Sequence, residues 1–246
     1  MIEICCGSYE DALAAYRAGA KRIELNSALH LGGLTPSVGS LRLVKQSTDL
    51  KVIAMVRPRG AGFCYSKADF ETMKADAELL MENGADGIAF GCLNEHGNIH
   101  IEQTKEIIDI IKKYHGEVVF HRAFDCVKDP FGTMEKLIAL GVDRVLTSGL
   151  KAKAMDGAEL IEELQKWYGD KIEILAGSGI NASNAIEIME KTGIHQVHSS
   201  CKGWVMDPTT TGKDVSYSYA EGIHKDDYDV VDEELVRKLI KSIKKQ

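Results

Sequence analysis

Several features that mark membrane, secreted and zinc-binding proteins are missing from this sequence. It contains no run of about 18 consecutive apolar residues, so we predict no membrane-spanning helix. The first residues, Met1–Cys6, lack the basic region and the long apolar core of a signal peptide, and we therefore expect a cytoplasmic protein. The six cysteines form neither a C-x-x-C pair nor a zinc-finger spacing. We therefore expect free thiols and no closed structural zinc site.

The net charge and the length of the chain further limit what kind of protein this can be. The formal net charge of -7 and the pI near 5.7 argue against general binding to nucleic acids or to anionic membranes. The chain has 246 residues and a hydrophobic content of 44%, which suits one large α/β domain. No domain boundary stands out, and we predict a single domain over residues 1–246.

Short apolar or β-branched runs alternate with amphipathic stretches along the whole chain. The expected strands are Ile2–Cys5, Arg22–Asn26, Lys51–Arg57, Gly87–Gly91, Glu117–His121, Arg144–Ser148, Glu173–Ala176 and Gln196–Ser199. The expected helices include Tyr9–Ala18, Lys67–Asn83, Glu102–Tyr114, Phe131–Ala139, Gly157–Trp167 and Ala182–Lys191. Gly19, Gly84, Gly141 and Gly193 stand where left-handed caps would end four of these helices.

Eight strand–helix units in a chain of about 250 residues predict an α/β fold, the TIM (β/α)8 barrel. An open, doubly wound sheet is the alternative. No G-x-G-x-x-G follows the first predicted strand, which weighs against a dinucleotide-binding sheet of that kind. After the last strand, residues 202–231 are predicted to be a polar, irregular excursion, and residues 232–245 a C-terminal helix that closes the ring.

The stretch Phe120–Asp125 places a His, an Arg and an Asp where a buried strand should emerge into a loop. Polar groups there are costly to bury without a partner or a ligand. Strand side chains alternate between the barrel interior and the helix layer, and barrels of this kind carry their sites at the carboxyl ends of the strands. The inward-pointing residues that we expect to form a catalytic site are Glu3, Glu24, Arg57, His121 and His198. The alternative is a structural ion network in the barrel centre.

Two loops are candidates for further contacts. Gly177, Ser178 and Gly179 follow the seventh strand and precede a helix that we expect to begin at Asn181 or Ala182. Backbone N–H groups at such a helix start can hold an anion, and Arg59, Ser199 and Ser200 can add to the same anion-binding site. The alternative is a tight turn that needs glycine. The loop Gly32–Ser37 is predicted to end in a helix with Thr35 as N-cap and Pro36 in the first turn.

Cysteines at strand ends raise the question of copper. Cu(I) prefers soft sulfur ligands. The cysteines that lie at or just past predicted strand ends, where two could approach one another, are Cys5, Cys92, Cys126 and Cys201. Cys6 should face the helices. The alternative is that each buried cysteine is a small apolar filler.

Six segments together resemble the CutC copper homeostasis family. They are Ile23-Glu24-Leu25, Gly32–Ser37, Val56–Gly60, Phe120–Asp125, Leu146–Gly149 and Val197–Ser200. The resemblance spans the chain from Glu3 to about Cys201. It implies a TIM barrel, a cytoplasmic location, a homo-oligomer (dimer or tetramer) and Cu(I) binding in which Cys5 is a metal ligand. In that family, copper binding is attributed to two cysteines. In this sequence, Asn26 occupies the position of the second cysteine.

Two functions therefore stand as hypotheses. The first is an enzyme that acts on a small anionic metabolite, phosphorylated ones included, with His121 or His198 as general acid or base. In it, Glu3 or Glu24 orients the histidine, while Arg57 and Arg59 bind the negative charge. Schiff-base chemistry is disfavoured because no lysine falls inside a strand end. The second is a non-catalytic Cu(I) carrier centred on Cys5.

Overall fold

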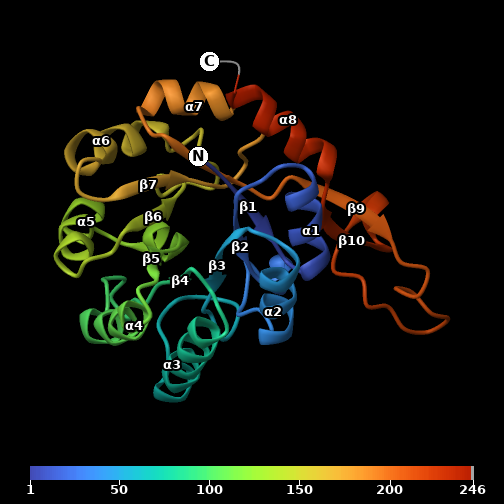
Figure 1. The fold of residues 1–246 in the computed structure, drawn as a ribbon, viewed down its shortest axis with the longest axis horizontal. Helices are drawn as coiled ribbons and strands as arrows, with labels where there is room; N and C mark the ends of the chain where they lie inside the picture. Colours follow the sequence, from blue (N-terminus) through green and yellow to red (C-terminus); the bar gives the residue numbers. More distant parts are fainter. Residues whose placement is uncertain (245–246) are drawn as a thin grey trace.

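Eight parallel strands close into a barrel. In a computed structural model that describes residues 1–244, the strands pair in chain order, and β1 also pairs with β8, which closes the ring. The barrel strands are β1 (Ile2–Cys6), β2 (Arg22–Leu25), β3 (Lys51–Met55), β4 (Gly87–Phe90), β5 (Glu117–Phe120), β6 (Arg144–Thr147), β7 (Glu173–Ala176) and β8 (Gln196–Ser199). All eight predicted strands are present, and the predicted TIM barrel is confirmed (Figure 1).

Helices surround the strands. They are α1 (Tyr9–Arg17), α2 (Val38–Ser47), α3 (Lys67–Glu82), α4 (Ile101–Lys113), α5 (Pro130–Ala139), α6 (Ala158–Tyr168), α7 (Ala185–Thr192) and α8 (Glu233–Ile243). Three short 3-10 helices are η1 (Leu29–Leu31), η2 (Arg122–Cys126) and η3 (Gly222–His224). None of the helices within residues 1–244 combines the length and the apolar character needed to cross a membrane.

The four glycines predicted to end helices do so. Gly19, Gly84, Gly141 and Gly193 have φ values of 97°, 94°, 80° and 73°, the left-handed region that glycine enters without steric cost. Each lets the chain leave a helix and turn back into the next strand. These caps explain why the sequence pattern predicted the strand–helix units so well.

The starts of two helices were predicted wrongly. Ser37, not Thr35, caps α2, and its side chain accepts a hydrogen bond from the Ser40 N–H. The Thr35 hydroxyl oxygen instead accepts from the Arg57 N–H at 3.0 Å, which joins the loop after β2 to the end of β3. The helix α7 begins at Ala185, not at Asn181 or Ala182, because residues 181–184 form a side-chain-bonded turn in which Asn184 Oδ1 accepts from the Asn181 N–H.

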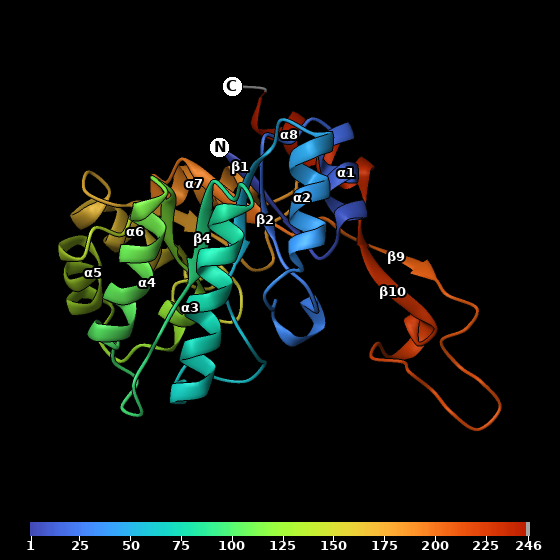
Figure 2. The same cartoon turned by 60° about the horizontal axis from the view of Figure 1, so that its bottom comes forward.

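The excursion predicted over residues 202–231 is irregular only between its two ends. The ends form an antiparallel pair, β9 (Lys202–Met206) and β10 (Asp227–Val231), which projects from one side of the barrel (Figure 2). The strands pair with each other and not with the barrel, so they need no long apolar run, and this is why the sequence did not reveal them. The Asp11 carboxylate joins this pair to the barrel by accepting hydrogen bonds from the Val231 and Gly7 N–H groups.

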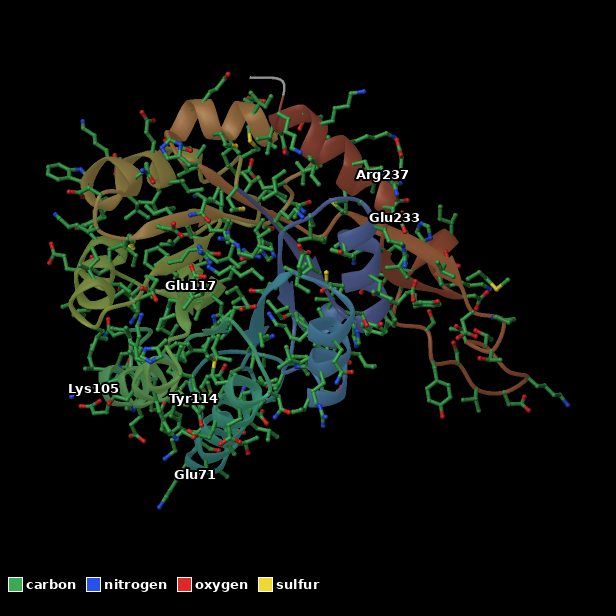
Figure 3. All side chains as sticks on the ribbon, viewed as in Figure 1. Glu71, Lys105, Tyr114, Glu117, Glu233 and Arg237 are labelled. Atoms are coloured by element: carbon green, nitrogen blue, oxygen red, sulfur yellow. The ribbon has the colours of Figure 1, made fainter. Side chains whose placement is uncertain are left out.

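The helix after this pair completes the outer ring. Predicted over residues 232–245, it runs from Glu233 to Ile243 with Asp232 as N-cap, and Lys245 lies outside the described residues. Val236 and Leu239 are its buried residues. Glu233, beside Arg237 in Figure 3, also pairs with Arg17 of α1 at 2.6 Å. The last helix therefore covers the seam where the barrel closes.

The interior of the barrel has an apolar side and a charged side. Ile53, Met55, Ala89 and Val119, from β3 to β5, form an inner apolar cluster separate from the main core between strands and helices. Charged side chains fill the rest of the interior. Buried ion pairs join Glu3 to Arg22 at 2.7 Å and to Arg144 at 3.8 Å, and the Arg144 guanidinium also pairs with Glu117 and Glu173.

We predict that Arg144→Met lowers the free energy of unfolding by about 3–5 kcal/mol, because it leaves buried carboxylates without their cation. Arg144 is only 1% exposed. Chemical denaturation measures the loss. Lys238→Met is the control, because Lys238 pairs with Glu234 at the surface and its removal should cost no more than about 1 kcal/mol. Equal effects of the two substitutions would contradict the role of the buried network.

Candidate functional site at the carboxyl ends of the strands

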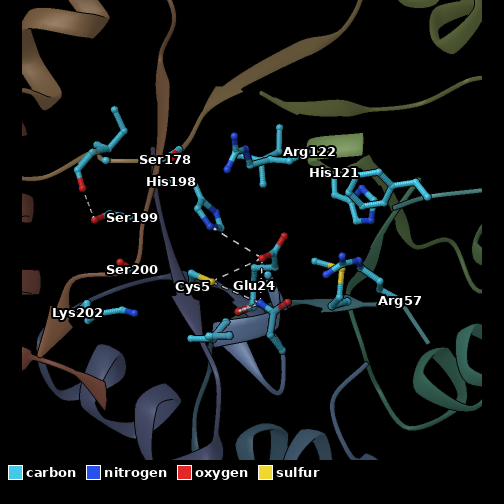
Figure 4. A pocket seen from close by; sticks show the side chains of 18 residues that line it. Cys5, Glu24, Arg57, His121, Arg122, Ser178, His198, Ser199, Ser200 and Lys202 are labelled. Atoms are coloured by element: carbon cyan, nitrogen blue, oxygen red, sulfur yellow. Dashed lines mark hydrogen bonds and ion pairs between the residues drawn. The ribbon is translucent and has the colours of Figure 1, made fainter. Parts of the chain in front are cut away.

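A cavity of about 300 Å³ lies at the carboxyl ends of the barrel strands. It brings together side chains from strands far apart in the sequence, as Figure 4 shows. The predicted site residues that line it are Cys5, Glu24, Arg57, His121, Ser178, Gly179, His198, Ser199 and Ser200. Glu3, Arg59 and Gly177 are not among its lining residues.

His198 is held between two buried carboxylates. Its Nδ1 lies 2.9 Å from Glu3 Oε1, and its Nε2 lies 3.9 Å from Glu24 Oε2. Glu3 sits below the cavity, where Arg22 and Arg144 surround its other oxygen. The ion network in the barrel centre and the cavity above it are thus connected through one carboxylate.

Burial and neighbouring charges shift the pKa values of His198, Glu3 and Glu24. Burial by itself raises the pKa of Glu3, but the hydrogen bond to His198 and the charge of Arg22 outweigh it and lower the pKa to about 2. Burial by itself lowers the pKa of His198, but Glu24 and Glu3 raise it above its usual value. Burial raises the pKa of Glu24. Glu3 is therefore an anion at neutral pH, whereas the pKa values of His198 and Glu24 are both raised.

Cys5, Glu24 and His198 form a potential metal-binding group. One ligand atom from each lies within 4.8 Å of the others. Asn26 adjoins them, because its Nδ2 donates to Glu24 Oε2 at 2.9 Å and lies 3.6 Å from Cys5 Sγ. Burial, together with the charge of Glu24, raises the pKa of the Cys5 thiol well above its usual value. The thiol is therefore protonated at neutral pH unless a metal replaces the proton.

The other cysteines lie elsewhere. Cys6 is part of the main apolar core and faces away from the cavity, as predicted. Cys92 and Cys201 are buried in the same core, and Cys126 is exposed. Within residues 1–244, none of these sulfurs joins Cys5 in the potential metal-binding group.

Arg57 holds two loops over the cavity. Its Nη1 donates to the carbonyl oxygens of Leu31 and Gly33, at 2.9 and 3.0 Å, and its Nη2 donates to that of Ala61 at 2.6 Å. The Phe63 ring lies under the guanidinium, 5.1 Å from Cζ to the ring centroid. Arg57 was predicted to bind an anion, but most of its N–H donors therefore bind carbonyl oxygens of the loops at the mouth of the barrel.

The second arginine of this segment points away from the site. Arg59 pairs with Asp69 at 3.1 Å, and its remaining donors bind the carbonyl oxygens of Gly60, Gly62 and Cys64. Its side chain organises the loop that leads to α3. Arg57 has the cavity-facing position because it continues the inward face of β3, whereas Arg59 follows Pro58 outside the strand.

His121 is a neutral, buried imidazole. Its Nδ1 accepts a hydrogen bond from the Ala123 N–H at 3.1 Å, and burial together with the charge of Arg57 lowers its pKa to about 3. The ring fits because Gly91 has no side chain, since a Cβ there would lie 2.8 Å from the imidazole. Its environment thus differs from that of His198 in both charge and hydrogen bonding.

The loop after β7 forms part of the cavity wall. Ser178 and Gly179 both adopt left-handed conformations, with φ of 81° and 76°. The hydroxyls of Ser178 and Ser199 donate to the carbonyl oxygens of Ala152 and Ile180, whereas Ser200 is exposed at the rim. Because α7 begins later than predicted, any anion here would meet loop N–H groups and not a helix terminus.

Two cations at the cavity were absent from the predicted site. Arg122 lines the cavity and is oriented by Asp125 at 2.7 Å and by Ser148 Oγ at 2.8 Å. It directly follows His121 in the same motif, which is a signal that could have identified it. Lys202 also lines the cavity. It gave no such signal, because it belongs to β9.

The two histidines should differ in their titration, because the pKa of His121 is lowered and that of His198 is raised. We predict that the His121 ring shows no titration between pH 8 and 5, because its pKa is about 3, whereas His198 titrates with a midpoint above 6.5. Proton NMR of the ring Cε1–H signals, assigned with His121→Gln and His198→Gln, measures both. Glu3→Gln should lower the His198 midpoint. A His121 ring that titrates near 6.5 would contradict the assignment.

Comparisons with known proteins place the chain in a family. It matches the CutC family over residues 1–203. A CutC family protein of Treponema denticola is 46% identical over 244 residues, which are 98% of each chain. The human copper homeostasis protein cutC homolog is 44% identical over 202 residues, 82% of this chain and 73% of the human protein.

A solved structure supports the same assignment. The CutC protein of Streptococcus agalactiae superposes with a TM-score of 0.77 at 28% identity, over 81% of this chain and 98% of that one. The family match ends at residue 203, near the start of β9, although the Treponema relative aligns along almost the whole chain. The resemblance drawn from the six sequence segments is confirmed: this chain belongs to the CutC family.

Proposed function

We propose that the cavity is the active site of an enzyme that transfers a proton on a small anionic metabolite, with His198 as the proton carrier. The observation that carries this proposal is the position of His198 between the buried carboxylates of Glu3 and Glu24, at the wall of a cavity of about 300 Å³. A histidine ordered in this way has a defined tautomer and a pKa tuned by its neighbours.

Each carboxylate has a separate part in this proposal. Glu3, kept ionised by Arg22 and Arg144, accepts the Nδ1–H of His198 and leaves Nε2 on the side of Glu24 and the cavity. Glu24, whose pKa is raised by burial, keeps its proton to a higher pH than an exposed carboxyl group does. Neighbouring groups with opposed pKa shifts are typical of acid–base sites.

The surroundings favour an anionic substrate. Arg122 and Lys202 line the cavity in a chain whose formal net charge is -7, so the positive charge is local. The loop at Ser178 and Gly179 adds backbone N–H groups to the wall of the cavity. These contacts suit a carboxylate or a phosphate group.

Copper binding is the second candidate function, and one observation favours it. Cys5, Glu24 and His198 could each direct one ligand atom to a common point, and the Cys5 sulfur is the kind of donor that Cu(I) prefers. Since the Cys5 thiol is protonated at neutral pH, binding would release a proton and tighten as the pH rises. The name of the human relative links the family to copper homeostasis.

For copper, we predict that Asn26→Cys strengthens Cu(I) binding and that Cys5→Ser weakens it, each by more than about tenfold. The Asn26 side chain lies 3.6 Å from Cys5 Sγ, so a cysteine there would place a second sulfur beside the first. Titration against a chromogenic Cu(I) competitor measures both changes. Equal, weak binding by the wild type and Cys5→Ser would end the copper proposal.

For the enzyme, we predict that the protein catalyses exchange of a carbon-bound proton with D2O in a small anionic carbonyl compound. Oxo acids and sugar phosphates that stabilise the protein in a thermal-shift screen are the compounds to test by proton NMR. His198→Gln should slow the exchange by about 10²–10⁴-fold, whereas Cys5→Ser should keep it.

The pair of variants separates the two functions. Cys5 and His198 both belong to the potential metal-binding group, but only His198 lies between the two carboxylates. Exchange that survives in His198→Gln, or a wild-type protein that exchanges no proton in any compound it binds, would contradict the enzyme.

A further inference from the structure

Two residues that line the cavity each carry a buried N–H donor that has no hydrogen-bond acceptor within residues 1–244. One belongs to His121, whose Nδ1 accepts from the Ala123 N–H, so the ring proton of the neutral imidazole is on Nε2. Within residues 1–244, Nε2 is buried and has no hydrogen-bond partner. The residue is 3% exposed and lines the cavity.

The second donor is Nε of Arg57. The other two nitrogens of this guanidinium donate to loop carbonyl oxygens, whereas Nε is buried and makes no hydrogen bond of normal geometry within residues 1–244; the Tyr65 hydroxyl also interacts with this guanidinium. The Phe63 ring contacts both groups, with its centroid 5.0 Å from that of the His121 ring and 5.1 Å from Arg57 Cζ. The two donors therefore form one wall of the cavity.

Buried donors without acceptors are costly, and folded proteins rarely keep them without a reason. Here the two donors belong to side chains that are already fixed by other bonds: the imidazole by its Nδ1, the guanidinium by three carbonyl oxygens. Neither can turn away to find a partner. A molecule that enters the cavity would supply the missing acceptor.

We propose that His121 Nε2–H and Arg57 Nε–H form a subsite for the carbonyl oxygen of the substrate, which is a small oxo acid or a related carbonyl anion. This inference rests on the proposed function and adds the class of substrate to it. A carbonyl oxygen accepts two hydrogen bonds, and the negative charge that it gains when a neighbouring C–H is ionised is stabilised by fixed donors of this kind.

The cavity separates the two ends of such a substrate. In Figure 4, Arg57 and His121 lie on one side, whereas Ser178, Ser200 and Lys202 lie on the other, with His198 and Glu24 between. The acidic group of the substrate would bind near Lys202, on the side of the cavity opposite His121. The carbonyl oxygen would then reach the His121 wall, and the carbon between them would face His198.

In this arrangement the two histidines have different roles: His198 transfers the proton, and His121 binds the carbonyl oxygen. The pair of His198 and Glu24 accepts the proton from the carbon next to the carbonyl group. The electrons of the broken C–H bond form the new C=C bond, and the carbonyl π electrons move to the oxygen held by His121 and Arg57. Return of the proton to carbon or oxygen completes an isomerisation or exchange with no oxidant or reductant. His121 donates a hydrogen bond throughout and keeps its own proton.

Matched acids test the subsite directly. Acetoacetate and butyrate differ by the carbonyl oxygen, as do 2-oxoglutarate and glutarate. We expect the wild type to bind at least one oxo acid more tightly than its matched acid by at least about tenfold in isothermal titration. His121→Phe should abolish this preference. His121→Gln, which retains an N–H donor, should retain part of it.

A spectroscopic measurement keeps the test valid if His121→Phe does not fold. In the wild type, the oxo acid should shift the His121 Nε2–H signal downfield in proton–nitrogen NMR, and the matched acid should not. Equal affinity for the oxo and matched acids, or a preference that persists in folded His121→Phe, overturns the subsite. If the subsite fails while His198-dependent proton exchange holds, the proposed enzyme stands with a different substrate. If carbonyl preference holds without exchange, the subsite stands and the acid–base role of His198 fails.

Discussion

The buried carboxylate of Glu3 connects most of what is specific about this barrel. One of its oxygens faces Arg22 and Arg144 in the barrel centre, and the other holds His198 at the floor of the cavity. A carboxylate buried this deeply is stable as an anion only because cations and a histidine surround it. The same interactions thus stabilise the fold and orient the histidine on which the proposed chemistry depends.

The loops at the mouth depend on a similar use of polar side chains. Arg57 binds carbonyl oxygens from the loops after β2 and β3. Asp125 accepts from Thr147 Oγ1 at 2.6 Å and from the Ser148 N–H at 2.9 Å, which fixes η2 to the end of β6. Two of the segments that carried the resemblance, Phe120–Asp125 and Leu146–Gly149, are therefore partners in space. Their polar residues hold the cavity in shape as well as lining it.

The same cavity also bears on the copper association of the family. Cys5 has the cavity-facing position, but its neighbours are the carboxylate of Glu24, the imidazole of His198 and the amide of Asn26. This set has one soft donor where a pair of thiolates would have two. Contacts within the chain hold His198 between Glu3 and Glu24, and N–H donors such as those of His121 and Arg57 suit an oxygen acceptor and not a cation.

The sequence by itself determined the repeated strand–helix units, because glycine caps and alternating apolar runs are local signals that no distant contact overrides. It also determined which residues of β1, β2, β5 and β8 point inward, since the two-residue period of a strand leaves only one choice. Only the tertiary structure decided the rest. Neighbours from other strands decide whether Arg57 binds a ligand or a loop, and why the pKa of His121 is lowered while that of His198 is raised. They also decide that Lys202 of β9 reaches the cavity. Burial and charge at those places come from the closed barrel, and no local pattern encodes them.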